Sequence, residues 1–291
     1  MVSTVGNSIK SILSEKLIEL SDLLNGDIFT FYGQIFDGLE NEILKIIEEI
    51  ADQEDKSDKL FVILTTGGGS ATAVERYVNI LRHHYDEVNF IVPDYADSAG
   101  TIFGMSGDQI YMDYVSGVGP IDRQIRTKDG NWVAALGYLD KINELIEKAN
   151  NNTISQAEFL ILREFDLAEL KGYEQAKELT ISLLKKWLVN FKFKNWSTHR
   201  THPILKGTEV TEVQKEARAE EIADMLSDNN RWKSHGRPIN IDTLEKELKL
   251  EIHDYSKQHD LRNSIREYYD LLSDFLRSNN VQNFMQTKLY I

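Results

Sequence analysis

The amino-acid sequence predicts an α/β protein with a parallel sheet in its first half and a largely helical second half. Between residues 27 and 125, short apolar runs alternate with segments of helical periodicity. This alternation is typical of βαβ units, in which right-handed crossovers join parallel strands. After about residue 130, helical periodicity dominates. We therefore expect an N-terminal helix over residues 1–26, a core over 27–130, and a helical region over 131–291 that packs on the core and forms oligomer interfaces.

The individual elements of the core follow from the spacing of apolar residues and from turn signals. Apolar residues at helical spacing run from Ile9 to Leu24, and Asn25-Gly26 supplies a stop. Continuous apolar runs such as Leu60–Leu64 are typical of strands that are buried on both faces of a parallel sheet. The expected strands cover residues 27–33, 60–64, 88–92 and 109–112. The expected helices cover residues 9–24, 36–50, 74–81 and 98–106.

The composition excludes several functional classes. The chain has 33 Lys and Arg residues against 47 Asp and Glu residues, which gives a formal net charge of −14. Such an acidic chain repels the phosphates of nucleic acids. It contains no cysteine, which excludes disulfides and thiolate chemistry. No apolar run approaches the roughly 20 residues that span a bilayer, and charges interrupt the apolar stretch near the N-terminus. We expect a cytoplasmic protein without a metal or other cofactor.

The first informative turn, Thr65-Thr66-Gly67-Gly68-Gly69-Ser70, follows a predicted buried strand and precedes a helix. Three glycines allow positive φ angles and a close approach to a ligand, and their N–H groups at a helix start can bind a negative oxygen. Three interpretations stay open. The turn is tight and binds nothing, it belongs to a dinucleotide site although Thr72 stands where the third glycine of that motif belongs, or it forms an oxyanion hole. A P-loop is excluded, because no Gly-Lys-Ser/Thr follows.

The second informative turn is centred on Ser98, which follows the next predicted strand and opens the next predicted helix. Ala96 and Gly100 stand two residues to either side of Ser98, and small residues there are the steric signature of a sharp turn that exposes a nucleophile. The alternative is an ordinary serine N-cap, which is very common at a helix start. Both turns should emerge at the carboxyl edge of one sheet, where ligands bind in open α/β folds. The sequence thus predicts a serine close to a cradle of glycine N–H groups.

Taken together, these segments resemble the Clp protease/crotonase superfamily, and most closely its serine dehydrogenase proteinase and signal-peptide-peptidase branch. The matching motifs are Gly33-Gln34-Ile35, GGGSA at 67–71 with Gly67 in the place of a proline, ADSAGT at 96–101, GDQIYM at 107–112 and SGVGPIDRQ at 116–124. A later segment, WKSHGRPI at 232–239, resembles part of the same branch. The resemblance implies a Clp protease/crotonase-like spiral of ββα units with a largely helical C-terminal half.

The same resemblance implies a serine peptidase in which Ser98 attacks a carbonyl group and forms an acyl-enzyme. The N–H group of Gly68, with Gly69 as a second candidate, and that of Ala99 would hold the oxyanion, and each such donor is typically worth a factor of ~10²–10³ in rate. Members of this superfamily are usually rings or stacked oligomers with internal active sites, which limits their substrates to peptides and unfolded segments. By this analogy we expect a homo-oligomer.

A serine needs a general base to become nucleophilic near neutral pH, and the sequence leaves the identity of this base open. Asp122 occupies the position of the Clp protease histidine, and a carboxylate is a poor base for a hydroxyl unless its pKa is raised. Lys141 follows Ser98 by 43 positions. It fits the serine–lysine dyad of the signal-peptide-peptidase branch, or it is an ordinary solvated lysine. His235, between Ser234 and Gly236, either reaches Ser98 or anchors its own loop.

These residues are compatible with three functions. A serine peptidase explains Ser98, its turn and the glycine cradle together. A catalytically inactive scaffold of the same fold would keep both turns without a functional base. A crotonase-like thioester enzyme would share the oxyanion hole but use acids such as Asp97 and Asp122, with no role for Ser98. We favour a serine peptidase, of Ser-Lys or Ser-His type, that acts on a peptide or protein substrate.

Overall fold

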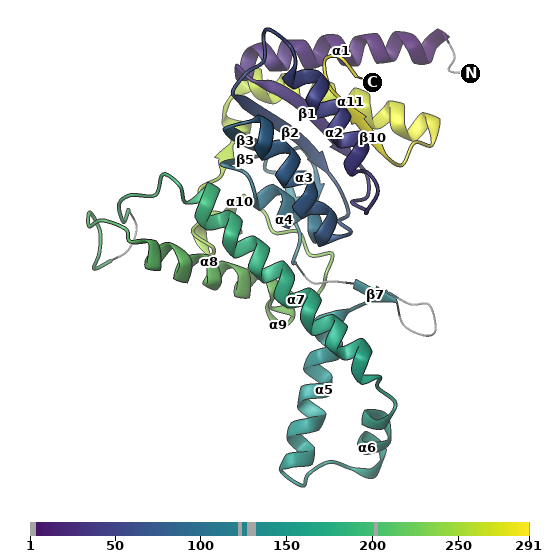
Figure 1. The fold of residues 1–291 in the computed structure, drawn as a ribbon, viewed down its shortest axis with the longest axis vertical. Coiled ribbons are helices and arrows are strands. Elements are labelled where there is room, and N and C mark those ends of the chain that lie inside the picture. Colours follow the sequence, from purple (N-terminus) through teal and green to yellow (C-terminus); the bar gives the residue numbers. More distant parts are fainter. Residues whose placement is uncertain (1–3, 122–123, 127–131, 201–202, 291) are drawn as a thin grey trace.

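The computed structural model describes residues 4–121, 124–126, 132–200 and 203–290, and a six-stranded sheet lies at the centre of the fold (Figure 1). The strands are arranged in the order β10-β1-β2-β3-β5-β9. All neighbours are parallel except the edge strand β10, which is antiparallel to β1. The four predicted strands are thereby confirmed, as is the α/β fold class. The bounds are β1 Asp27–Tyr32, β2 Lys59–Thr65, β3 Glu87–Val92, β5 Gln109–Met112, β9 His253–Asp254 and β10 Phe284–Gln286.

Helices cover both faces of this sheet, because its strands carry apolar side chains on both faces. On β2, Leu60, Val62 and Leu64 belong to the core on one face, and Phe61 and Ile63 to the core on the other. The result is a three-layer arrangement with the sheet in the middle (Figure 1). The first face packs against α2 Glu40–Ala51, α3 Ala71–His84 and α4 Ala99–Met105, and the second against α1 Thr4–Leu24 and α11 His259–Asn279.

The second half of the chain is mainly helical, as predicted. The long helix α7 Leu167–Trp187 continues into a π-helical turn, η1 Leu188–Lys192, and packs against α4 and α8. In Figure 1, α5, α6 and the first part of α7 project away from the sheet. The other elements of this region are β7 Gln124–Arg126, β8 Trp132–Ala134, α5 Ala135–Asn150, α6 Gln156–Arg163, α8 Glu212–Ser227, α9 Asn229–Trp232 and α10 Ile241–Lys246.

The last part of the chain returns to the sheet, which the hydrophobic pattern did not predict. Asp254 of β9 pairs with Met112 of β5, and Met285 of β10 pairs with Phe31 of β1. Strands of two or three residues are too short to show an alternation in the sequence. The domain boundary at residue 130 stays a prediction, and the sheet draws strands from both sides of it.

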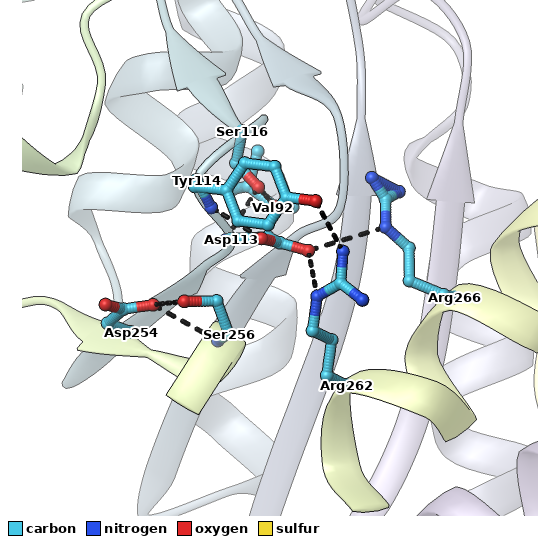
Figure 2. A network of polar contacts seen from close by, with 8 residues as sticks. All are labelled: Val92, Asp113, Tyr114, Ser116, Asp254, Ser256, Arg262 and Arg266. Carbon is cyan, nitrogen blue, oxygen red and sulfur yellow. Dashed lines mark hydrogen bonds and ion pairs between the residues drawn. The ribbon is translucent and has the colours of Figure 1, made fainter. Parts of the chain in front are cut away.

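A buried carboxylate fixes α11 beside the carboxyl end of β5 (Figure 2). The fully buried side chain of Asp113 lies 3.0 Å from Nε of Arg262 and 3.5 Å from Nε of Arg266. The Ser116 hydroxyl accepts a hydrogen bond from the N–H of Asp113 and donates one to the carbonyl of Val92, which ties this turn to the end of β3. These contacts hold α11 next to the edge of the sheet at which the two predicted turns emerge.

Candidate active site

Ser98 occupies the sharp turn between the short strand β4 Tyr95–Ala96 and helix α4, and it adopts φ 54° and ψ −115°. These angles lie outside the regions that L-residues normally populate. Ser98 stands at the N-cap position, but its side chain makes no capping hydrogen bond to α4, whose residues are all described. By contrast, Ser70 caps α3 in the usual way, with φ −84° and a hydrogen bond from the N–H of Ala73. The ordinary N-cap interpretation therefore explains Ser70 but not Ser98.

Small residues allow the Ser98 turn to close against the sheet. All seven residues of α4 are buried, and a Cβ atom on Gly100 would lie 2.3 Å from Cγ2 of Thr66. The hydroxyl of Thr101 donates to the carbonyls of Ala96 and Gly119, at 2.8 and 2.7 Å. The helix is thus locked below the serine, so the turn cannot relax without disturbing the core.

The glycine turn packs directly against the serine turn, as their predicted positions at one sheet edge require. Gly68 has φ 98°, and a Cβ atom there would lie 2.7 Å from the carbonyl oxygen of Asp97 and 2.9 Å from Cβ of Ser98. Gly69 has φ 143°, and a Cβ atom there would lie 1.8 Å from the carbonyl oxygen of Ile35. Both positions require glycine, the first for contact with the serine and the second for contact with the segment that follows β1.

The N–H groups of the two turns differ in their hydrogen bonding. The N–H of Gly68 donates to Oγ1 of Thr66 at 3.0 Å. The N–H groups of Gly69 and Ala99 make no hydrogen bond within the described part of the chain. Ala99 opens α4, where the first N–H groups have no partner inside the helix. Two backbone N–H groups of these turns therefore have no partner among the described residues, and Thr66, which the sequence did not single out, accepts the hydrogen bond of the third.

His235 lies in a loop that adjoins the serine turn through a small sheet. Strand β6 Gly117–Val118 pairs with β4 on one side, and Val118 exchanges two backbone hydrogen bonds with Ile239 on the other. The ring of His235 is partly buried, and its Nδ1 atom is buried without a hydrogen-bond partner among the described residues. Burial lowers the pKa of His235 below its ordinary value of 6.5. The structure therefore places His235 four residues before Ile239, which pairs with Val118 in β6, the strand beside β4.

Lys141 lies elsewhere, on the projecting helix α5 (Figure 1). Its side chain is 54% exposed and forms an ion pair of 2.8 Å with Glu144. Among the described residues, no contact joins it to Ser98. Asp122 lies outside the described residues. The structure thus packs Gly68 against Ser98 and its neighbour Ala99, whereas Gly69 packs against Ile35. It places His235 in an adjoining segment and leaves Lys141 in solvent.

An acidic residue, Asp97, directly precedes Ser98 in the turn. Its side chain is partly buried, and Oδ1 lies so close to Gly119 that a Cβ atom there would be 2.7 Å away. Burial, and after it the negative charge of Asp94, raises the pKa of Asp97. Asp94 follows the end of β3. Two carboxyl groups therefore accompany the serine at this edge of the sheet.

The described parts of the chain contain neither a metal-binding cluster nor a membrane-spanning helix. No group of three or more His, Asp or Glu side chains is arranged to hold a metal ion. No described helix combines the length and the apolar character needed to cross a membrane.

Comparisons with known proteins point to one family. A family model described as ClpP-like SDH-type serine proteinase matches residues 22–204. Two uncharacterized proteins of Methanocaldococcus jannaschii are similar in sequence. MJ1495 is 33% identical over 130 residues, which are 42% of this chain and 43% of the relative. MJ0137 is 28% identical over 211 residues, which are 72% of this chain and 58% of the relative. The matches thus span about half the length of these relatives.

Solved structures of the 1510-N membrane-bound stomatin-specific protease are also similar. A serine-to-alanine mutant matches with a TM-score of 0.45 and 13% identity, covering 80% of this chain and 81% of the other. A lysine-to-alanine mutant in complex with a substrate peptide matches with a TM-score of 0.44 and 15% identity, covering 77% of this chain and 72% of the other.

Proposed function

Because the chain belongs to the family of ClpP-like SDH-type serine proteinases, we propose that it cleaves peptides or unfolded protein segments through an acyl-enzyme on Ser98. The observation that carries this assignment is the backbone of Ser98, with φ 54° and ψ −115°. A non-glycine residue in such a region costs on the order of 1–3 kcal/mol, and such strain clusters at active sites. A strained turn between strand and helix is also the geometry that exposes a serine nucleophile.

The reaction needs donors for the oxyanion, and the turns supply them. Ser98 Oγ attacks the carbonyl carbon, its proton passes to the base, and the carbonyl electron pair moves onto oxygen. We assign the N–H groups of Gly69 and Ala99 to this oxygen, because neither has another partner in the described chain. Gly68 supports the turn by packing on Ser98, and its N–H joins the oxyanion hole when it leaves Thr66. The C–N bond then breaks, the base protonates the amine, and water releases the acyl group.

His235 is the better-supported base. It is partly buried, its Nδ1 is without a partner among the described residues, and its lowered pKa keeps it neutral at pH 7 and ready to accept a proton. Lys141 is the alternative. As an exposed, ion-paired ammonium it would act as a base only if assembly of the protein buried it, because desolvation is what lowers a lysine pKa.

Labelling with a fluorophosphonate probe tests this assignment, since the probe reports an activated serine without a known substrate. Wild type should label, Ser98→Ala should not, and Ser70→Ala, which removes an ordinary capping serine, should label like wild type. If His235 is the base, His235→Gln should lose labelling and Lys141→Ala should keep it. The labelling rate should then rise with pH through a value below 6.5 and become constant near neutrality, whereas a lysine base would keep the rate rising into the alkaline range. Folded wild type that does not label would favour the inactive scaffold or the thioester enzyme.

A further inference from the structure

A cavity of about 290 Å³ opens at the same edge of the sheet as Ser98, but on the face that α11 covers. Its wall is formed by Tyr32 at the end of β1, Asp94 beyond the end of β3, and Tyr269, Ser273 and Arg277 on α11. The Asp113 ion pairs described above hold α11 in place as this wall (Figure 2). One wall of the cavity therefore belongs to a helix that is fixed to the sheet edge.

Asp94, the acidic residue of this cavity, has no cationic partner among the described residues. The hydroxyl of Tyr269 donates to Oδ2 of Asp94 at 3.3 Å. No Lys, Arg or His side chain forms an ion pair with Asp94 within the described chain. The one cationic side chain in the described wall, Arg277, is 78% exposed and pairs with Asp274 at 3.8 Å. A carboxylate without a cationic partner in the wall of a concave site favours a cationic ligand.

A buried hydroxyl lies beneath the cavity. Oγ1 of Thr65 is buried and interacts with the hydroxyl of Tyr269 in the cavity wall. Thr65 pairs with Tyr32 across the two strands, and it continues the series of Phe61 and Ile63, which face α11.

The cavity is close enough to the nucleophile to contact the same substrate. Asp94 and Ser98 are four positions apart in the chain, and this length of chain spans at most about 14 Å. Asp94 is also close enough to Asp97 to repel its charge, since burial first and the charge of Asp94 second raise the pKa of Asp97. A cation bound beside Asp94 would relieve this repulsion. A peptide held at Ser98 can therefore reach the cavity with a residue up to about four positions from the cleaved bond.

We propose that this cavity is a specificity subsite of the Ser98 centre that binds a lysine or arginine side chain of the peptide substrate. Asp94 is the specificity-determining group, and the hydroxyls of Tyr32 and Tyr269 accept the N–H donors of the bound side chain. This inference rests on the proposed peptidase function. It adds a preference that the family assignment does not contain.

Binding to an inactive variant tests the subsite apart from catalysis. The Ser98→Ala protein is titrated with fluorescent peptides that differ only in carrying Lys, Gln or Glu at one of four positions on either side of a central bond, and fluorescence anisotropy reports the Kd. At one position the Lys peptide should bind about tenfold more tightly than the Gln peptide, as expected for one charge-assisted hydrogen bond. Adding Asp94→Asn should remove this difference, and Asp94→Lys should reverse it in favour of Glu.

The matched control is Asp270→Asn, which removes an equal charge from an exposed position on α11 next to Tyr269. It should leave the preference for Lys unchanged. Equal affinity for the Lys, Gln and Glu peptides at every position would overturn the subsite, as would a preference that Asp270→Asn weakens as much as Asp94→Asn. A failure of the peptidase assignment appears separately, as folded wild type whose Ser98 does not label.

Discussion

The backbone of Ser98 leads to an unusual expectation, namely that replacing the proposed nucleophile by glycine makes the protein more stable. The φ of 54° and ψ of −115° at Ser98 cost a residue with a Cβ atom on the order of 1–3 kcal/mol, and glycine adopts such angles without that clash. Against this gain, glycine gives the unfolded chain more freedom, which is worth about 0.4–1 kcal/mol. We therefore expect Ser98→Gly to raise the free energy of unfolding by about 0.5–2 kcal/mol while abolishing activity.

Equilibrium denaturation in urea, followed by tryptophan fluorescence, measures this change. Ser98→Ala keeps the Cβ atom and its strain, so its stability should stay close to that of wild type. Ser70→Gly is the matched control, because Ser70 is an unstrained N-cap with φ −84°, and this variant should lose a few tenths to about 1 kcal/mol. If Ser98→Gly were destabilised like Ser70→Gly, the turn would store no strain, and the structural reason for regarding it as a built nucleophile turn would be lost.

Three other expectations concern the glycine turn, the Asp113 ion pairs that hold α11, and Lys192, a partly buried lysine. Gly67→Ala should be tolerated, because no atom lies within 4 Å of the added Cβ. Gly68→Ala and Gly69→Ala should each abolish fluorophosphonate labelling and lower the melting temperature. If all three variants were tolerated equally, the described packing would be contradicted. Asp113→Ala should lower the free energy of unfolding by about 3 kcal/mol, because it leaves two arginines without their carboxylate partner. If denaturation shows that the free energy of unfolding falls by less than about 1 kcal/mol, the ion pairs of Asp113 contribute little to stability. Burial lowers the pKa of Lys192 to about 8, so the unfolded chain binds more protons than the folded one between about pH 8 and 10, and wild-type stability should rise with pH across this window. Lys192→Met should therefore be more stable than wild type at pH 7, by roughly 1–3 kcal/mol, and denaturation at a series of pH values should show this advantage shrinking towards pH 10.

The arrangement of the two turns could be predicted from the sequence because it depends on local signals. Apolar runs located the strands, and parallel strands bring their carboxyl ends to one edge, so Gly68 and Ser98 had to be neighbours. The strain at Ser98 is consistent with the small residues around it, Ala96 and Gly100. These features are encoded within a few residues of each other, which is the range over which a sequence pattern can be interpreted.

Other features depend on contacts between distant segments and could not be predicted. Asp113 and Arg262 are 149 positions apart, and no local pattern connects an acid after one strand with an arginine on a late helix. The occupation of the Gly68 N–H by Thr66 depends on the rotamer of one side chain. The exposure of Lys141 depends on the direction in which α5 leaves the core. Its separation from Ser98 along the chain does not predict the distance between the two residues in space. The cavity beside Asp94 likewise depends on the position of α11, which no local sequence pattern specifies.

The origin of both edge strands in one late stretch of chain has a consequence for biosynthesis. Residues 253–286 supply β9 and β10, so β1 leaves the ribosome about 250 residues before its partner Met285. Until then the nascent sheet has two open edges, which are templates for pairing with other chains. The wall that α11 contributes to the cavity is also missing during this period. A growing chain would therefore carry the serine turn before it had a complete substrate-binding face, and it would depend on chaperones, or on rapid completion of synthesis, to avoid aggregation.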